Sequence, residues 1–285
     1  MSVPMSVPMN VSVGVIQFPG TNCDLDTLDA LAELGARTAL LRSDETSLSG
    51  VDAVVIPGGF AHGDYLRTGA IARFSPIMDA VASFAGAGGP VVGICNGFQV
   101  LTEAGLLPGA LRPNAGLSFL CQPQQLAMAS VHHVLGHGLS PSDQLSIPIN
   151  HFEGNYVCDR ATLQRLRENG QVVMRYVANP NGSVDDIAGI CNEAGNVVGL
   201  MPHPERATSE LLGSADGRKL LEALLYAQRA PVKPSVTTRH EDAPVCDGTG
   251  FAGREPGDLK CQPPLVMPAR ASMSGVTPNS RHVAY

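Results

Sequence analysis

Hydrophobic positions in the first part of the chain alternate between short unbroken runs and segments of helical spacing. The unbroken runs predict strands at residues 11–17, 37–41, 51–56 and 91–95. Between them, residues 24–35 and 76–87 carry apolar side chains at the spacing of amphipathic helices, and the first of these contains Leu25, Leu28, Leu31 and Leu34. Buried strands separated by helices predict a mostly parallel sheet that is covered by helices on both faces.

The pattern changes after about residue 115. Apolar runs at 172–177, 187–191 and 197–201 predict further strands, and the sequences Asn-Pro-Asn-Gly and Asn-Glu-Ala-Gly-Asn between them are typical of hairpin turns. Residues 216–229 predict a closing helix with leucines on one face. We therefore expect an α/β fold in which the second half of the chain adds antiparallel strands to the sheet.

The two ends of the chain differ from the part between them. Residues 1–10 repeat Met-Ser-Val-Pro without the basic and apolar regions of a secretory signal, and they predict a disordered leader. Residues 231–285 are rich in proline and have no apolar periodicity, which predicts a disordered tail. Cysteines and histidines in that tail fit no common metal-ligand spacing. One folded domain is expected at residues 11–230.

Composition narrows the possible partners and the compartment. The 285-residue chain has a formal net charge of -7 and no run of lysine or arginine, so it carries no electrostatic footprint for nucleic acid or for a membrane surface. No stretch approaches the roughly 20 apolar residues that span a bilayer. The seven cysteines are scattered and include no Cys-x-x-Cys pair, which favours a reduced, cytoplasmic protein.

The most informative motif is Gly93-Ile-Cys-Asn-Gly97, which ends one predicted strand and begins a helix. The pattern places Cys95 at a sharp strand-to-helix turn, where Gly93 and Gly97 permit close backbone approach. The N-terminus of the following helix favours a thiolate. Cys95 is therefore predicted to be a nucleophile. The alternative is that it is only a small buried residue at the end of a strand.

A candidate base lies in Met201-Pro-His-Pro-Glu205, directly after another predicted strand. Prolines on both sides of His203 favour an extended chain, in which His203 and Glu205 project to the same side. A carboxylate beside an imidazole sets its tautomer and stabilises the imidazolium that forms when it takes a proton. Cys95, His203 and Glu205 are thus predicted as nucleophile, base and orienting acid. The alternative is a chance histidine in a surface loop.

Paired glycines follow a third predicted strand in Ile56-Pro-Gly-Gly-Phe60. Glycine lets a backbone N–H group face a ligand, as an oxyanion hole requires. The carboxyl ends of parallel strands meet at one edge of a sheet, so this turn is expected beside the elbow. The backbone N–H groups of Gly59 and Asn96 are predicted to hold the oxyanion.

Together these motifs resemble the class I glutamine amidotransferase family, and more narrowly the glutaminase subunits of phosphoribosylformylglycinamidine synthase in purine biosynthesis. The resemblance covers about residues 11–226 and implies a flavodoxin-like, mostly parallel sheet flanked by helices. Besides the elbow and Pro202-His-Pro-Glu-Arg206, it rests on Phe18-Pro-Gly-Thr-Asn-Cys-Asp24, Pro57-Gly-Gly-Phe-Ala-His-Gly-Asp-Tyr-Leu-Arg67, Gly69-Ala-Ile-Ala72, Leu101-Thr-Glu-Ala-Gly-Leu-Leu-Pro-Gly109, Glu153-Gly-Asn155 and Asn179-Pro-Asn-Gly-Ser183.

The resemblance implies a complete reaction. Cys95 would attack the side-chain amide of L-glutamine, His203 would carry the proton to the departing ammonia, and Gln99 would help to hold the substrate. The ammonia would pass to a larger synthetase subunit of the PurL type, which uses ATP and Mg²⁺ to make formylglycinamidine ribonucleotide, with a small PurS-type subunit also expected. This chain has no Gly-x-x-x-x-Gly-Lys-Ser/Thr loop, so the ATP chemistry is expected in another subunit. Neither a cofactor nor a metal is expected in this chain.

Two groups of histidines stand outside this reaction. Asn150-His-Phe-Glu-Gly154 replaces the family's usual Ala-His-Gly-Glu-Gly, so the role of His151 stays open between substrate contact and partner docking. His132, His133 and His137 lie in the weakly matching stretch 115–145. We interpret these three as surface or packing residues, because no carboxylate or cysteine is suitably spaced for a metal.

Two alternatives belong to other functional classes. A hydrolase of the related cysteine-elbow type would usually have a histidine directly after the nucleophile, whereas Asn96 stands there in this chain. A non-enzymatic binding subunit could use the same fold, since a fold alone does not prove an activity. The presence of Cys95, His203 and Glu205 together argues against the second alternative.

Overall fold

The computed structural model describes residues 11–227, so the predicted leader at 1–10 and tail at 231–285 lie outside the described residues. Nine strands in the described range form one mixed sheet in the order β2-β1-β3-β4-β11-β10-β9-β6-β7. These are β1 Ser12–Gln17, β2 Arg37–Arg42, β3 Ala53–Ile56, β4 Val91–Ile94, β6 Leu120–Met128, β7 Gln144–His151, β9 Val172–Tyr176, β10 Ile187–Cys191 and β11 Val197–Leu200.

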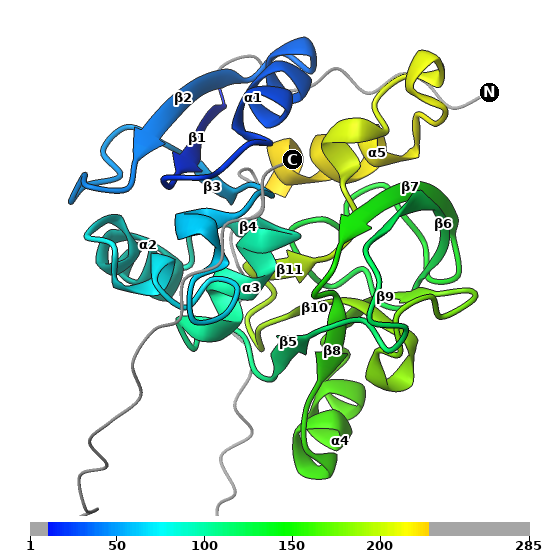
Figure 1. The fold of residues 1–285 in the computed structure, drawn as a ribbon. Coiled ribbons are helices and arrows are strands. Elements are labelled where there is room, and N and C mark those ends of the chain that lie inside the picture. The colour runs from blue at the N-terminus through cyan, green and yellow to red at the C-terminus, as the bar shows by residue number, and fades with distance from the viewer. Residues whose placement is uncertain (1–10, 228–285) are drawn as a thin grey trace, which may run out of the picture. The chain divides into compact units, whose positions relative to one another are not determined.

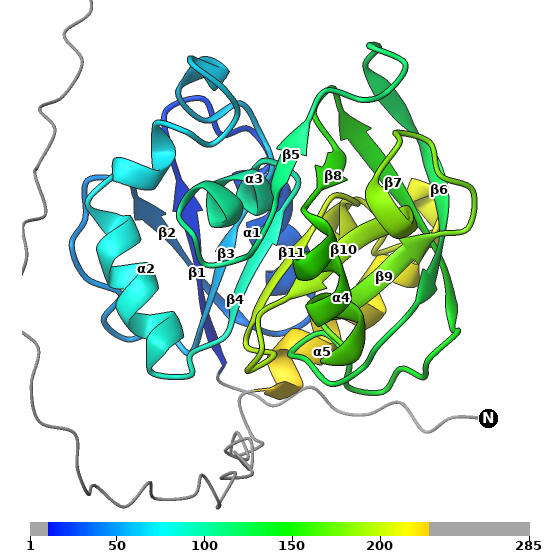
Figure 2. The same cartoon turned by 90° about the horizontal axis from the view of Figure 1, so that it is seen from below.

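Five neighbouring strands, β2, β1, β3, β4 and β11, run parallel. Their helices are α1 Asp24–Glu33, α2 Ile77–Gly86, α3 Asn96–Glu103 and α5 Asp216–Ala227. α1 and α5 lie on one side of the sheet and α2 and α3 on the other (Figures 1 and 2). Both faces are covered, and β3, β4 and β11 are accordingly buried at every position. The predicted α/β class is confirmed.

One detail of the predicted helix pattern is wrong. In α1, Leu31 and Leu34 pack into the core as expected, but Leu25 is 64% exposed. Asp24 and Thr27 are buried in the first turn instead. The polar groups find partners there: the Thr27 hydroxyl donates to the Cys23 carbonyl, and the Gln17 amide donates to Asp24.

The parallel strands bring three motifs to the same edge of the sheet. β3 ends before Gly58, β4 ends directly before Cys95, and β11 ends shortly before His203. The register pairs Ile56 with Gly93 and Ile94 with Leu200, so the three strand ends are level with one another. This alignment places residues that are far apart in the sequence around one point.

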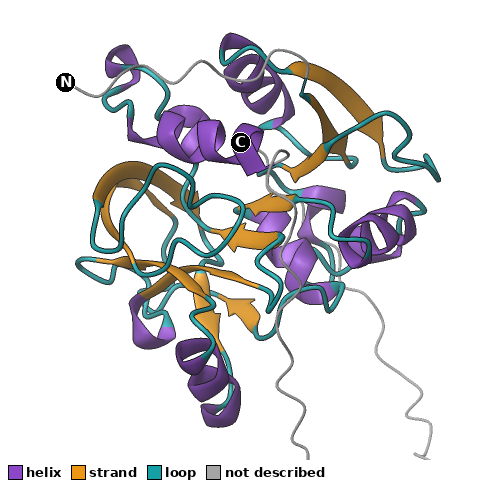
Figure 3. Ribbon diagram, turned by 180° about the vertical axis from the view of Figure 1, so that it is seen from behind, coloured by secondary structure: helices purple, strands orange, loops and turns teal. Residues whose placement is uncertain are grey.

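The remaining strands, β10, β9, β6 and β7, pair antiparallel with one another. β6 and β7 were not predicted, and neither were the small two-stranded sheet of β5 Ala110–Arg112 and β8 Asn155–Val157 or the helix α4 Arg160–Glu168. Every second residue of β7 is buried. Figure 3 shows the strands and helices of both halves from behind. No helix in residues 11–227 is long and apolar enough to cross a membrane.

Candidate active site

Cys95 occupies a strained turn between β4 and α3. Its backbone has φ 51° and ψ −104°, a conformation that is costly for any residue other than glycine. A Cβ on Gly93 would lie 2.6 Å from the backbone of Gly97, and one on Gly97 would lie 1.9 Å from the Ile56 carbonyl oxygen. The predicted sharp elbow is confirmed, together with the need for both glycines.

Cys95 contacts strands of both halves of the sheet, through its backbone and through its thiol. Its backbone N–H donates to the Leu200 carbonyl at 2.7 Å, which ties the elbow to β11. Its Sγ lies 3.6 Å from the Asn150 carbonyl oxygen at the end of β7. The side chain is 6% exposed, so little water competes for the sulfur.

His203 and Glu205 form a buried pair after β11. Nδ1 of His203 lies 2.6 Å from Oε1 of Glu205, and the two residues are 1% and 3% exposed. The predicted extended chain is wrong here, because Pro204–Arg206 forms a 3-10 turn that folds the carboxylate back towards the ring. The predicted proximity of the two side chains is nevertheless confirmed.

The electrostatics of His203 suit a proton carrier. Burial by itself would lower the pKa of His203, but the charges of Glu205 and Cys95 raise it well above its usual value. Because Nδ1 is engaged with the carboxylate, Nε2 is the nitrogen left to exchange protons. That atom is buried and has no hydrogen-bond partner among the described residues.

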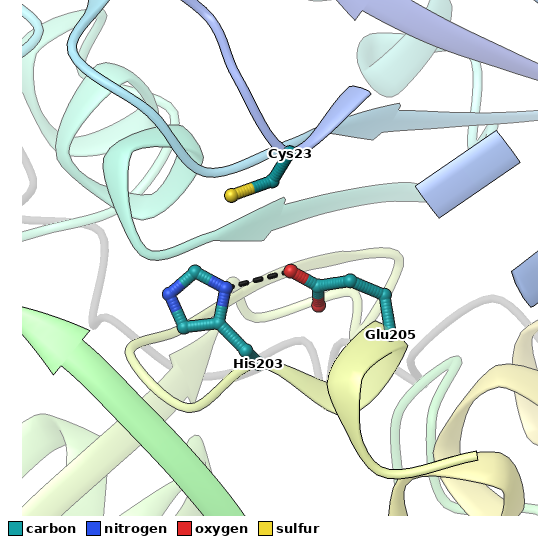
Figure 4. Close-up of side chains that lie close together, drawn as sticks. All are labelled: Cys23, His203 and Glu205. Carbon is teal, nitrogen blue, oxygen red and sulfur yellow. Dashed lines mark hydrogen bonds and ion pairs between the residues drawn. The ribbon is translucent and has the colours of Figure 1, made fainter. Parts of the chain in front are cut away.

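Cys23 joins this pair and was not identified from the sequence (Figure 4). It precedes α1 and is 2% exposed, and its Sγ accepts a hydrogen bond from Arg206 Nη2 at 3.1 Å. The side-chain atoms of Cys23, His203 and Glu205 that could bind a metal ion lie within 4.8 Å of one another. No other group of three or more such side chains is found in the described range. Only the block Phe18-Pro-Gly-Thr-Asn-Cys-Asp24 hinted at its importance.

This cluster does not offer an open metal site. His203 and Glu205 are already hydrogen-bonded to each other, and the Arg206 guanidinium donates to the Cys23 sulfur. A metal cation would have to displace both of these contacts. The expectation that the chain holds no metal stays a prediction.

A pocket opens beside Cys95 and His203 and takes its walls from both halves of the sheet. The predicted residues Gly59 and Gln99 line it. The remaining lining residues are Asn22, Cys23, Phe60, Asp64, Thr68, Phe119, Asn150, His151, Phe152 and Glu153. Asn96 lies behind this surface, where its side-chain oxygen accepts from the Ala61 N–H at 3.0 Å.

Gln99 is engaged by the protein itself. Its Nε2 donates to the Glu153 carbonyl at 2.6 Å, and its Oε1 accepts from Asn96 Nδ2 at 2.8 Å. The side chain therefore links the start of α3 to the loop after β7. This places Gln99 as a support for the pocket wall, while the predicted contact with substrate stays a prediction.

The three histidines of the stretch 115–145 lie apart from this pocket's lining. His133 Nε2 pairs with the Ser130 carbonyl at 2.8 Å, and burial lowers the pKa of His133 to about 4. The His137 ring packs at 4.7 Å from the ring of Tyr226. His132 is exposed and has no part in a group of metal-ligating atoms within residues 11–227.

Comparison with known proteins agrees with this geometry. Residues 10–220 match the family model of the CobB/CobQ-like glutamine amidotransferase domain. The chain is 53% identical over 216 residues to the phosphoribosylformylglycinamidine synthase subunit PurQ of Lacticaseibacillus casei (strain BL23), covering 75% of this chain and 95% of that protein. It is also 53% identical over 213 residues to the PurQ subunit of Rubrobacter xylanophilus, covering 75% and 97%.

Solved structures extend the likeness to three dimensions. A chain in the structure of PurLQS from Thermotoga maritima matches with a TM-score of 0.71 and 40% identity, covering 76% of this chain and 99% of that one. A glutamine amidotransferase from Thermotoga maritima matches with a TM-score of 0.53 at 17% identity, which supports the fold alone. The chain belongs to the glutamine amidotransferase family and, within it, to the PurQ glutaminase subunits of phosphoribosylformylglycinamidine synthase.

Proposed function

We propose that this chain hydrolyses L-glutamine through a thioester on Cys95 and delivers the ammonia to a synthetase partner. The observation that carries the proposal is the buried His203–Glu205 pair, held at 2.6 Å at the same sheet edge as a strained cysteine. A thiol, a base and a carboxylate that orients the base are the parts that nucleophilic acyl transfer requires.

The chemistry proceeds in two steps. Sγ of Cys95 attacks the carboxamide carbon, and His203 Nε2 receives the thiol proton and gives it to the nitrogen. The C–N bond then breaks, releasing ammonia and leaving a γ-glutamyl thioester. In the second step water attacks the thioester, its proton passes through His203, and the C–S bond breaks to give glutamate and the free thiol. Glu205 stabilises the imidazolium in both steps.

The negative oxygen of each tetrahedral intermediate needs donors close to Cys95. We assign this role to the backbone N–H groups of Gly59, which lines the pocket, and of Asn96, the first residue of α3. A Cβ on Gly59 would lie 2.8 Å from the Asn22 nitrogen, so no side chain fits where this backbone approaches the pocket. The N-terminus of α3 adds its dipole at the same point.

The partner is expected at the mouth of the pocket, where large apolar side chains are exposed. Phe60, Phe119 and Phe152 line the pocket and are 48%, 48% and 40% exposed, and Tyr65 and Leu66 nearby in the chain are 73% and 90% exposed. We assign this surface to a PurL-type synthetase subunit, in keeping with the PurLQS assembly that contains a similar chain. ATP and Mg²⁺ would act in that subunit, and a PurS-type subunit would complete the complex in the cytoplasm.

The test is Cys95→Ala in the reconstituted complex. We expect the variant to lose glutamine-dependent amidine synthesis by at least about a thousandfold, since the covalent step has no substitute, and to keep ammonia-dependent synthesis. Cys121→Ser, at an exposed cysteine on β6, is the matched control and should keep both activities. Equal loss of both activities in Cys95→Ala would contradict the assignment of Cys95 to ammonia release.

A further inference from the structure

The pocket beside Cys95 contains two carboxylates, and the one imidazole with a raised pKa in its lining, that of His203, is already paired with Glu205. Asp64 and Glu153 both line it, and none of its lining residues is a lysine or an arginine. Burial and the charge of Glu153 raise the pKa of Asp64 to about 6. Two carboxylates that repel each other in a half-buried pocket are stabilised by a cation that enters it.

The imidazole of His151 adds a hydrogen-bond acceptor to the pocket. The Asn114 amide nitrogen donates to the carbonyls of Ser118 and His151, at 2.9 and 3.0 Å. Its oxygen therefore faces Nδ1 of His151 at 3.1 Å and also accepts from the Gly154 N–H. Nδ1 must carry the ring proton, which leaves Nε2 of His151 as an acceptor.

The second nitrogen of His151 has no partner inside the protein. Burial, together with the charge of His203, lowers the pKa of His151 to about 4, so the ring is neutral at physiological pH. The residue is 2% exposed, lines the pocket, and its Nε2 has no hydrogen-bond partner among the described residues. A buried acceptor without a partner is costly and indicates that a donor enters with a ligand.

These observations define the ligand group as a donor with positive charge. We propose that Asp64 and Glu153 bind the α-ammonium group of glutamine and thereby select α-amino amides over other amides. This rests on the proposed function, which fixes the carboxamide carbon at Cys95. An amide substrate so placed has one charged donor left to recognise, three carbon–carbon bonds from the reacting centre, and the acid pair lies in the same pocket.

Side chains of α3 contact the Asp64 carboxylate and the backbone of Glu153, and Thr68 holds the Glu153 carboxylate. Asn96 Nδ2 approaches Asp64 Oδ1 at 3.5 Å, and Gln99 Nε2 donates to the backbone of Glu153 at 2.6 Å. The Thr68 hydroxyl donates to Oε2 of Glu153 at 2.9 Å. Because Asn96 and Gln99 lie in the first turn of the helix that Cys95 caps, the acid pair is positioned relative to the nucleophile.

Asp64→Asn tests this assignment, with glutamine compared against glutaramate, which is glutamine without the α-amino group. The measurement is steady-state glutaminase activity of the complex. We expect the variant to lose about 30- to 100-fold in kcat/KM for glutamine, mainly through KM, because a charge-assisted contact is lost. Activity on glutaramate should change less than about threefold, since that substrate has no ammonium to lose. Glu153→Gln should show the same pattern.

The controls separate this proposal from the one on which it rests. Asp44→Asn, in the exposed pair with Arg42, should leave both substrates unaffected. Ammonia-dependent synthesis and the melting temperature show whether each variant has folded. An equal loss on glutamine and glutaramate, or no loss on either, would overturn the ammonium assignment even where Cys95→Ala behaves as expected. Undiminished glutamine hydrolysis in Cys95→Ala would instead overturn the proposed function.

Discussion

The parallel and antiparallel halves of the sheet contribute different kinds of group to the pocket. The parallel half supplies Cys95, His203 and Gly59, each within about three residues of the end of a buried strand. The antiparallel half supplies the loop after β7, with His151 and Glu153. In the proposed reaction the first set makes and breaks bonds, whereas the second set faces the substrate. The reacting groups thus all come from the parallel half, whereas the antiparallel half supplies only groups that face the substrate.

The two halves hold their pocket residues by different kinds of contact. Strand ends in the parallel half are fixed by pairing on both sides and by close backbone contacts, such as that between Gly97 and the Ile56 carbonyl. The loop after β7 is fixed by side-chain amides instead, chiefly Asn114 and Gln99. A loop held by side chains can change its contacts without disturbing the strands that carry the nucleophile.

The largest effect is expected from Gly97→Ala, which disturbs the close backbone packing of the parallel half. The new Cβ would lie 1.9 Å from the Ile56 oxygen, so the elbow or β3 has to move. We expect glutaminase activity to vanish and stability to fall by roughly 3 kcal/mol or more, as overpacking against backbone does. Chemical denaturation and a glutaminase assay measure both effects.

The matched control is Gly86→Ala, the same substitution at the end of α2. Nothing lies within 4 Å of the added Cβ there, and alanine favours a helix, so stability should change by less than about 1 kcal/mol. Equal melting temperatures for the two variants would show that the elbow is not the tightly packed point of the sheet.

Asn114→Ala tests the antiparallel half. Its amide makes four hydrogen bonds that hold Ser118, His151 and Gly154, and it is 1% exposed. We expect a loss of roughly 2–3 kcal/mol in stability, since buried partners are left unsatisfied. kcat/KM for glutamine should fall about 10- to 100-fold, with KM changing more than kcat, because the loop faces substrate.

Asn169→Ala, at the exposed end of α4, is the control and should leave kinetics unchanged. Should Asn114→Ala lower kcat while KM stays constant, the antiparallel half takes part in bond making. The separation of roles between the halves would then be wrong.

The same contrast explains what could be predicted from the sequence. Runs such as Val54-Val55 and Val91-Val92, and the glycines around Cys95, are local signals, so the parallel strands and the elbow were predicted correctly. β6 and β7 were not predicted because proline interrupts both strands, with Pro123 paired opposite Pro148, and because polar residues such as Gln122 and Gln125 break the apolar run of β6.

The two recognition carboxylates stand in blocks that carry the family resemblance, but nothing in the sequence indicated that they lie together. Asp64 and Glu153 lie far apart in the sequence and meet only because β7 returns to the edge where the loop after β3 begins. The pairing of His203 with Glu205 was predicted, but from an extended chain rather than the observed turn. Spacing within a motif thus predicted the chemistry, whereas contacts between the halves required the fold.

The smallest expected effect is the pH dependence of substrate recognition by Asp64. Asp64 faces Glu153 from the loop after β7 and the Asn96 amide from α3, and its pKa is raised to about 6 by burial and by Glu153. The raised pKa means that Asp64 loses its charge as pH falls below 6, so binding of an ammonium weakens in that direction. His151, His203 and Cys95 line the same pocket and would also affect the rate.

The ratio of kcat/KM for glutamine to that for glutaramate isolates Asp64, because both substrates use the same nucleophile and base. With a pKa of about 6, the ionised fraction of Asp64 falls about fourfold between pH 7 and pH 5.5, and the ratio should fall by a similar factor in the wild-type protein. In Asp64→Asn the ratio should stay flat over this range. A flat ratio in the wild-type protein would mean that the carboxylate from the parallel half does not contact the ammonium, leaving recognition to the antiparallel half alone.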